Sequence, residues 1–563
     1  MEIGEGRAAY REPTIKRDNA LPVEGYELRI EPDAILLTAR DDAGEQHGRN
    51  TLAQLVRVHA DGLPVATIND WPDLAVRAVM LDISRDKVPS MATLEDLVVR
   101  LASWKINQLQ LYIEHTFAYD GHEEVWADAG ALTSDEIRHL DAFCRRHHVE
   151  LVPNQNCLGH MGRWLRHERY RSLALTPDGF TDMLGRTRPP MTLDPANPGS
   201  LALVRELLGQ LVPCFTSSRV HVGLDEPWEL ADERVGDYLE WIAALRALPE
   251  LAGREMLVWS DLLSNYPERL EHLPTDVTVC EWGYEDWHPF DERAASLAAA
   301  GANFYVCPGT STWMTMFGRT TNMLGDCANA AAAALAHGAE GYLNTDWGDQ
   351  GHLQYLPVSE PGFAYGAAVA WCLESNRDLD LAAALDAHVF FDSAGELGGA
   401  LLALGDVYRE VPLIPNVSGV TLHLYFPQLR LGSGPTNGIT DAAIDRVEDT
   451  VAGALDRLGR ARSARPDAGL VLDELRTSAA LVQVLCRDAH ARLAGDGSLA
   501  SVPQSVRREL ATALDVVVDA HRDLWLARNR PGGLADSVRW LTHLRDCYET
   551  GVPQRDWGSA YVG

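Results

Sequence analysis

Apolar, strand-like runs alternate with patterns of helical period from about residue 78 onwards. The predicted strands are Val79–Ser84, Gln108–Glu114, Glu150–Asn156, Val220–Asp225, Met256–Asp261, Val277–Trp282, Phe304–Pro308 and Gly341–Trp347. The predicted helices between them include Thr93–Trp104, Ser134–His148, Leu201–Val212 and Asn322–His337. Eight strands with intervening helices indicate an α/β fold of the (β/α)8 TIM-barrel type. A doubly wound open sheet is the alternative, but it usually has fewer strands and often a glycine-rich phosphate loop, which this sequence lacks.

Two segments of different character flank the predicted barrel. Residues 25–70 combine strand patterns at Tyr26–Ile30 and Ala34–Thr38 with a short helical pattern at Asn50–His59. Beyond about residue 385, the chain is rich in Pro and Gly over 408–440 and helical in period over 441–550, which predicts a bundle of about four helices. The helical stretches are Ala442–Arg460, Leu470–Leu493 and Val506–Arg528. We therefore predict a small α+β domain over 1–72, the barrel over 73–385 and a C-terminal helical domain over 386–563.

Polar and aromatic residues lie at or just after the carboxyl ends of the predicted strands, where barrel enzymes carry their active sites. They are Arg85, Glu114, His115, Asn156, His160, Asp225, Glu226, Asp261, Glu281, Trp282, Trp347 and Asp349, with Thr310, Ser311 and Trp313 after the seventh strand. One such residue alone could be a helix cap or a buried polar group whose hydrogen bonds are satisfied. A single tryptophan lies in the core as often as it forms part of a binding surface. Their shared placement at one face favours a site for sugar chemistry.

The adjacent carboxylates Asp225 and Glu226 are the strongest chemical signal in the sequence. They end the strand-like run that starts at Arg219, and Pro227 stops that strand because it has no N–H to donate. Two neighbouring carboxylates repel each other, so one of them should have a raised pKa, which suits acid/base catalysis of glycosidic bond cleavage. An acidic surface loop is the alternative reading of the pair alone.

Composition narrows the classes of function. The formal charge of −32 argues against nucleic acid or anionic membranes as partners, since both need a positive surface. No stretch of about 18 apolar residues indicates a membrane span, and the N-terminus has no apolar signal-peptide core. The nine cysteines are scattered without metal-ligand spacing, so we expect free thiols, no metal, no cofactor and a cytoplasmic location.

The motifs resemble those of the family 20 glycoside hydrolases, the β-N-acetylhexosaminidases, over roughly residues 20–375. The family's His-x-Gly-Gly-Asp-Glu is similar to His221–Glu226, with Leu224 in place of the second glycine. Arg77–Arg85 resembles the family's first barrel strand, and Trp104–Leu109 resembles the segment that leads into its second strand. Gly159-His160 resembles the family's Pro-Gly-His, Trp347–Asp349 its Trp-x-Glu, and the segment through Pro72 its small N-terminal domain.

Three family motifs are altered, which marks a divergent member. Tyr112–Thr116 lacks the strand-two aspartates, and Pro153–Asn156 lacks the charges of Pro-Glu-x-Asp. Residues 307–313 contain no clear counterpart of the strand-seven Tyr-x-Asp.

The resemblance implies exo-acting hydrolysis of terminal N-acetylhexosamine by substrate-assisted, retaining catalysis, in which the 2-acetamido oxygen attacks C1. It implies Glu226 as acid/base and Asp225 as the residue that orients the acetamido group. Among the substrate-binding residues, Arg85 and Asp349 would bind sugar hydroxyls, and the sugar ring would stack on three tryptophans, Trp282, Trp313 and Trp347. His160 would support Glu226. Glu114 and His115 would replace the aspartate that is the family's usual partner of this histidine.

Two other classes remain open: a glycosidase for a related sugar without the 2-acetamido group, and an inactive sugar-binding protein. The expected partner is an oligosaccharide or glycoside. The C-terminal apolar stripe, which includes Leu475 and Leu485, either closes within the bundle or forms a homodimer. In the dimer reading, Tyr408, Tyr425 and Phe426 of the 408–440 loop would edge the mouth of the active site.

Overall fold

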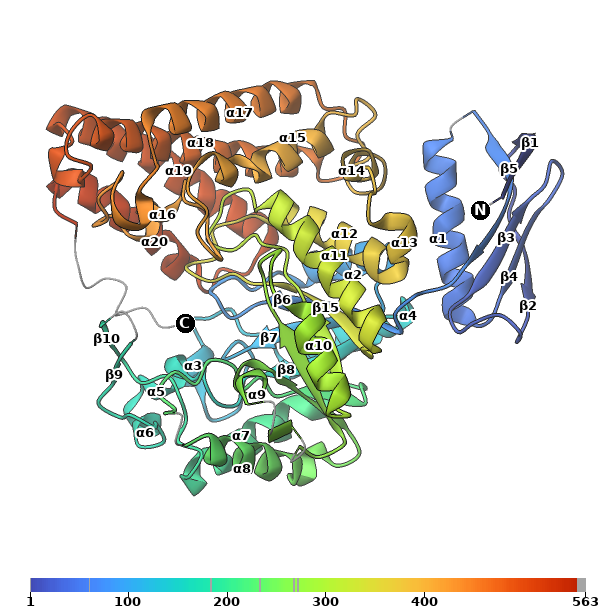
Figure 1. Ribbon diagram of the computed structural model, residues 1–563, viewed down its shortest axis with the longest axis horizontal. Coiled ribbons are helices and arrows are strands. Elements are labelled where there is room, and N and C mark those ends of the chain that lie inside the picture. The colour runs from blue at the N-terminus through green and yellow to red at the C-terminus, as the bar shows by residue number, and fades with distance from the viewer. Residues whose placement is uncertain are drawn as a thin grey trace.

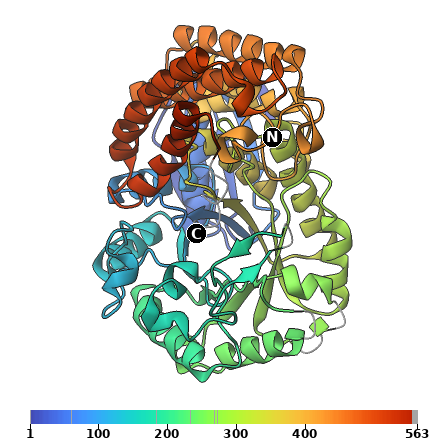
Figure 2. The same cartoon turned by 90° about the vertical axis from the view of Figure 1, so that its left-hand side faces the viewer.

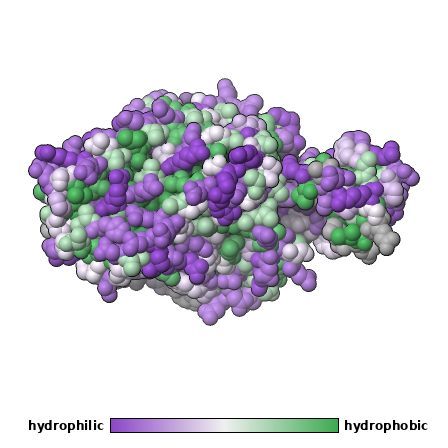
Figure 3. All heavy atoms as spheres, turned by 90° about the horizontal axis from the view of Figure 1, so that it is seen from above, coloured by the Kyte–Doolittle hydropathy of each residue, from purple (hydrophilic) through white to green (hydrophobic). Residues whose placement is uncertain are grey.

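The computed structural model describes residues 2–59, 61–182, 185–231, 234–266, 269–270 and 273–553. Three parts are visible in Figure 1: a small sheet with one helix, a barrel, and a group of long helices on the barrel's other side. Figure 3 shows hydrophilic side chains over much of one face and a narrow connection between the small sheet and the main body.

The N-terminal part is a five-stranded sheet in the order β1-β5-β3-β4-β2. Its strands are β1 (Glu2–Ala8), β2 (Thr14–Arg17), β3 (Tyr26–Ile30), β4 (Ile35–Ala39) and β5 (Leu63–Asp70). Helix α1 (Asp42–Val58) begins at Asp42, not at the predicted Asn50, because Asp41 caps it by accepting the N–H of Gly44. Glycine weakens a helical sequence pattern. Gly48 nevertheless lets the helix pack closely, since a Cβ there would lie 2.3 Å from Leu37 Cδ1.

Eight parallel strands form a closed barrel in the order β11-β12-β13-β14-β15-β6-β7-β8, which confirms the predicted fold class. The strands are β6 (Val76–Asp82), β7 (Gln108–Ile113), β8 (Glu150–Gln155), β11 (Arg219–His221), β12 (Glu255–Trp259), β13 (Val277–Trp282), β14 (Asn303–Cys307) and β15 (Gly341–Asp346). A two-stranded hairpin, β9 (Phe180–Thr181) and β10 (Thr187–Arg188), follows β8. β11 is shorter than the predicted Val220–Asp225 because the backbone turns left-handed at Gly223 and Leu224.

The segments between the strands carry the outer helices of the barrel. These are α2 (Met91–Ser103), α3 (Glu123–Trp126), α4 (Ser134–Arg146), α5 (Gly162–Leu165), α6 (Glu168–Arg171), α7 (Pro198–Leu211), α8 (Val235–Arg246), α9 (Asp261–Asn265), α10 (Phe290–Ala299), α11 (Thr320–His337), α12 (Leu356–Trp371) and α13 (Leu373–Asn376). The barrel core below the site is apolar and includes Val76, Met80, Leu257 and Leu343.

The C-terminal part is helical, as predicted. It contains α14 (Leu381–His388), α15 (Leu397–Gly405), α16 (Leu422–Tyr425), α17 (Asp441–Arg460), α18 (Ala468–Leu493), α19 (Gln504–Arg528) and α20 (Leu534–Thr550). Consecutive helices of α17–α20 pack against one another, and Figure 2 shows them along one side of the barrel. Buried ion pairs such as Arg465–Glu360 (2.6 Å) join the helices to the barrel. Over the described ranges, none of the helices is long and apolar enough to cross a bilayer. The limits 1–72, 73–385 and 386–563 stay predictions.

Candidate active site

A cavity of about 130 Å³ opens at the carboxyl ends of the barrel strands. Eight of the predicted residues line it: Arg85, His160, Asp225, Glu226, Trp282, Trp313, Trp347 and Asp349. They lie at or after the carboxyl ends of different strands, and closure of the barrel brings them to one place. Trp259, Tyr284 and Asn416 complete the lining.

The backbone after β11 turns the two carboxyls into this cavity. Gly223, Leu224 and Glu226 have φ values of 71°, 80° and 47°, a left-handed region that side-chain-bearing residues rarely adopt. The N–H of Glu226 donates to Oδ2 of Asp261 across 2.8 Å, which holds the turn. Strain of this kind persists where surrounding contacts fix the backbone, and it is frequent at functional sites.

His160 lies between the two carboxyls. Its Nε2 is 3.2 Å from Oδ2 of Asp225 and 3.5 Å from Oε2 of Glu226. Burial alone would lower the pKa of His160, but the charge of Asp225 and contacts with both carboxyls raise it well above its usual value. Asp225 is buried, whereas 35% of the Glu226 side chain is exposed, so Glu226 is the more accessible acid.

The pKa of Asp225 is lowered, so this carboxyl is ionised at neutral pH. Burial alone would raise this pKa, but the charge of His160 outweighs it, and Asn156 Nδ2 donates to Oδ1 across 2.5 Å. Asp261 and Asp349, which lie close to this pair, have raised pKa values. Burial, aided by the Asp225 charge, raises the pKa of Asp261 to about 8, and burial raises that of Asp349 to about 6.

Behind His160, Arg85 and Glu114 form a buried ion pair of 3.1 Å. Nδ1 of His160 lies 3.6 Å from Oε1 of Glu114 and 3.3 Å from Nη2 of Arg85. Burial opposes the charge on Arg85, but Glu114 and Asp82 keep its pKa well above the usual value. Glu114 therefore stands beside His160 and does not line the cavity itself.

His115 does not line this cavity, and its assignment as a substrate-binding residue stays a prediction. Glu114 and His115 lie in a bend just after β7, and Glu114 is the one that contacts His160. His115 lines a separate polar cavity with Asp86, Arg163 and Asp536. Burial, with the charge of Arg163 nearby, lowers its pKa well below the usual value.

Aromatic rings form the remaining walls. Tyr284 stacks on Trp282 at 5.2 Å, meets Trp313 edge-on at 4.9 Å, and accepts a hydrogen bond from Trp347 Nε1 across 2.7 Å. Sequence reasoning missed Tyr284 and Trp259. Both have a signal in the sequence, because Tyr284 lies two residues after Trp282 and Trp259 ends the β12 strand.

The 408–440 loop reaches the cavity through Asn416 and not through its predicted aromatic residues. Tyr408 is buried, where its hydroxyl accepts the N–H of Asn322. Tyr425 packs against Trp540, and Phe426 packs against the main apolar core. These three side chains are needed for packing, which the loop-like sequence pattern does not reveal.

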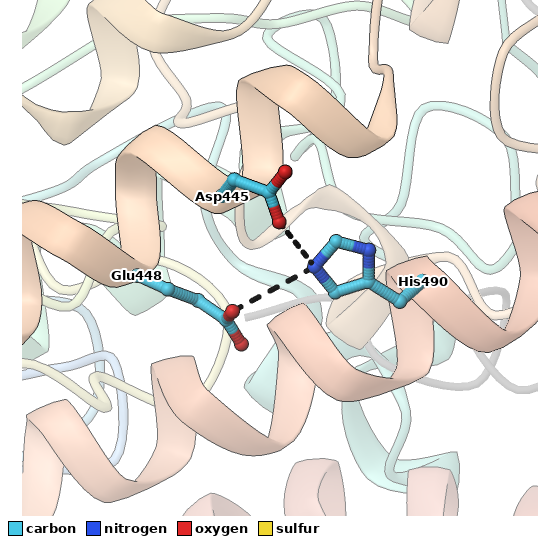
Figure 4. Close-up of side chains that lie close together, drawn as sticks. All are labelled: Asp445, Glu448 and His490. Atoms are coloured by element: carbon cyan, nitrogen blue, oxygen red, sulfur yellow. Dashed lines mark ion pairs between the residues drawn. The ribbon is translucent and has the colours of Figure 1, made fainter.

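One cluster in the described ranges has metal-ligand geometry: Asp445, Glu448 and His490, which face one another from α17 and α18 (Figure 4). The ring nitrogens of His490 also pair with Asp441 at 2.7 Å and with Asp445 at 3.5 Å. Ion pairs within the cluster account for this arrangement, and we assign no metal to it.

The fold and the site define a (β/α)8-barrel protein of the glycoside hydrolase class. Residues 5–71 match the family description "Glycosyl hydrolase family 20, domain 2", and residues 75–331 match "Glycosyl hydrolase family 20, catalytic domain". Together these matches cover more than half of the chain. The chain belongs to glycosyl hydrolase family 20.

Individual relatives agree with this family. A beta-hexosaminidase of Vibrio furnissii is 26% identical over 355 residues, which are 53% of this chain and 54% of that protein. A beta-hexosaminidase of Akkermansia muciniphila is 26% identical over 235 residues, 37% of this chain and 47% of that protein. The chain thus spans about half the length of these curated relatives. The crystal structure of an exo beta-N-acetylglucosaminidase from Vibrio harveyi shares the fold, with a TM-score of 0.53, 19% identity and 67% of each chain covered.

Proposed function

We propose that this protein is an exo-acting β-N-acetylhexosaminidase that uses substrate-assisted, retaining catalysis. The observation that carries the proposal is His160 Nε2 between Asp225 and Glu226 in a cavity walled by tryptophans. The names of the beta-hexosaminidases to which the chain is similar support the same activity. A cytoplasmic location, independence of metals and cofactors, and homodimerisation stay predictions.

In the proposed reaction, the 2-acetamido oxygen of the substrate attacks C1 while the bond from C1 to the leaving oxygen breaks. Glu226 gives its proton to that oxygen. A water then attacks C1, the bond from C1 to the acetamido oxygen breaks, and the water's proton passes to Glu226. The nucleophile belongs to the substrate, so the enzyme needs no second nucleophilic carboxylate.

Asp225 would accept the acetamido N–H and orient the attacking oxygen. Its lowered pKa supports this role, because an acceptor must be ionised to stabilise the positive charge that develops on the acetamido group. Arg85 and Asp349 would bind sugar hydroxyls, and Trp282, Trp313 and Trp347 would contact the apolar faces of the ring. Tyr284 offers a hydroxyl in the cavity, where the family's strand-seven tyrosine is missing.

A glycosidase for a sugar without the 2-acetamido group is the second candidate, and the absent strand-seven Tyr-x-Asp favours it. A sugar-binding protein without activity is the third. Aryl β-glycosides that carry N-acetyl, free amino or hydroxyl groups at C2 separate all three. We expect turnover of the N-acetyl substrate alone. Turnover of the hydroxyl substrate with equal efficiency would support the second candidate, and binding without turnover the third.

A further inference from the structure

One wall of the cavity comes from outside the barrel loops. Ten of its eleven described lining residues lie between Arg85 and Asp349, and the eleventh is Asn416. The match to the family's catalytic domain ends at residue 331. The segment that carries Asn416 therefore lies outside that match, and it belongs to the C-terminal part of the chain.

The loop that carries Asn416 is fastened to the barrel. The N–H of Asn416 donates to Oε1 of Glu285 across 2.7 Å, and Oε2 of Glu285 pairs with buried Arg319 at 2.9 Å. Further along the loop, Thr421 Oγ1 donates to the carbonyl oxygen of Met314 across 2.8 Å. Because one anchor is the backbone of Asn416 itself and the other lies five residues later at Thr421, Asn416 is held at the cavity.

Asn416 has a backbone conformation that suits its residue type and leaves its amide available. Its φ is 64°, in the left-handed region that asparagine tolerates better than most residues. The side chain is exposed, and no hydrogen bond to the part of the chain that the structure describes uses its amide. Trp259, Trp313 and Trp347 in the same cavity are buried, so Asn416 stands at the rim.

We propose that Asn416 binds the sugar unit on the leaving-group side and makes the enzyme selective for saccharide leaving groups. The inference rests on the proposed function. The buried tryptophans enclose the terminal sugar, and the partly exposed Glu226 must face the leaving oxygen, so the next unit lies at the rim. An amide offers a donor and an acceptor, which matches the hydroxyls of a second sugar.

The test compares two substrates, a β-linked N-acetylhexosamine disaccharide and an aryl β-N-acetylhexosaminide. Asn416→Gly keeps the left-handed backbone and removes the amide. We expect it to lower kcat/KM for the disaccharide about three- to tenfold more than for the aryl substrate, mainly through KM, as expected for one lost hydrogen bond. Asn416→Asp keeps the acceptor and loses the donors. Its kcat/KM for the disaccharide should therefore lie between the values of the wild type and Asn416→Gly.

Asn437→Gly is the matched control, since Asn437 is an exposed asparagine of the same C-terminal part and does not line the cavity. Thermal unfolding midpoints of all variants check that the fold is kept. If the wild type is active and the variant loses activity equally on both substrates, or loses none, the role of Asn416 is overturned. The proposed function is not affected by that result. A wild-type protein that hydrolyses neither substrate overturns the proposed function instead.

Discussion

The backbone N–H of Glu226 donates a hydrogen bond to the side chain of Asp261 across 2.8 Å. This contact ties the expected acid/base residue to the end of β12 and holds its backbone at a φ of 47°. One oxygen of Asp261 accepts the N–H, and the other has no hydrogen-bond partner among the described residues. With a pKa of about 8, the Asp261 carboxyl keeps its proton at neutral pH.

Asp261→Asn should therefore gain stability relative to the wild type as the pH rises. The unfolded chain loses the Asp261 proton near pH 3.8, whereas the folded protein keeps it to about pH 8. Between these values the folded state binds one more proton, so this group lowers the free energy of unfolding by up to about 1.4 kcal/mol per pH unit. The amide variant accepts the same N–H and has no proton to lose. Urea unfolding of both proteins at pH 5 and pH 8 measures the change, and a pH-independent difference would contradict the assignment.

Glu226→Gln should fold normally and lose about 10²–10⁴-fold in kcat, because general acid–base catalysis contributes about that much. The loss should be largest for substrates with poor leaving groups, since these depend most on proton donation. Steady-state kinetics with a series of aryl leaving groups measures it. Near-wild-type turnover of the least activated substrate would remove Glu226 from this role.

Asp225→Ala should weaken inhibition by a thiazoline that mimics the cyclic acetamido intermediate. Asp225 is ionised and positioned by His160 and Asn156, so it can accept the N–H of an acetamido group. Competitive inhibition constants for the wild type and the variant measure the effect. A wild-type enzyme that cleaves glycosides but ignores the thiazoline would favour the candidate without the 2-acetamido group.

Asp349→Ala should change the preference between gluco- and galacto-configured substrates. Asp349 lines the cavity, and it is one carbon shorter than the family's glutamate, so we expect it to bind hydroxyls at C4 or C6. The ratio of kcat/KM for the two substrates, in the wild type and the variant, is the measurement. If the ratio and both rates stay the same, Asp349 lies outside the productive site.

The predicted homodimer should use the exposed face of α19. Leu475 and Leu485 of the apolar stripe are buried within the chain, whereas Val516 and Leu526 on α19 are 68% and 52% exposed. We expect light scattering at micromolar concentration to give the dimer mass for the wild type and the monomer mass for the double variant Val516→Lys, Leu526→Lys. A monomeric wild-type protein would exclude the dimer.

The sequence by itself determined the barrel, the order of its strands and the side at which the site lies. Periodic burial of apolar residues is a local property, and parallel strands of a closed barrel end at the same face. Asp225, Glu226, His160, Arg85 and Asp349 could be chosen for this reason, since each lies at or just after the end of a predicted strand.

Only the tertiary structure decided which of these neighbours share a cavity. Glu114 and His115 are adjacent in sequence, yet Glu114 contacts His160 beside the active-site cavity whereas His115 lines a separate cavity, because the direction of a side chain depends on the backbone beyond the strand end. The proton on Asp261 depends on burial and on the charge of Asp225, which lies 36 residues earlier in the chain. Asn416 reaches the cavity from the C-terminal part because hydrogen bonds to Glu285 and Met314 hold its loop, and no local pattern encodes these contacts.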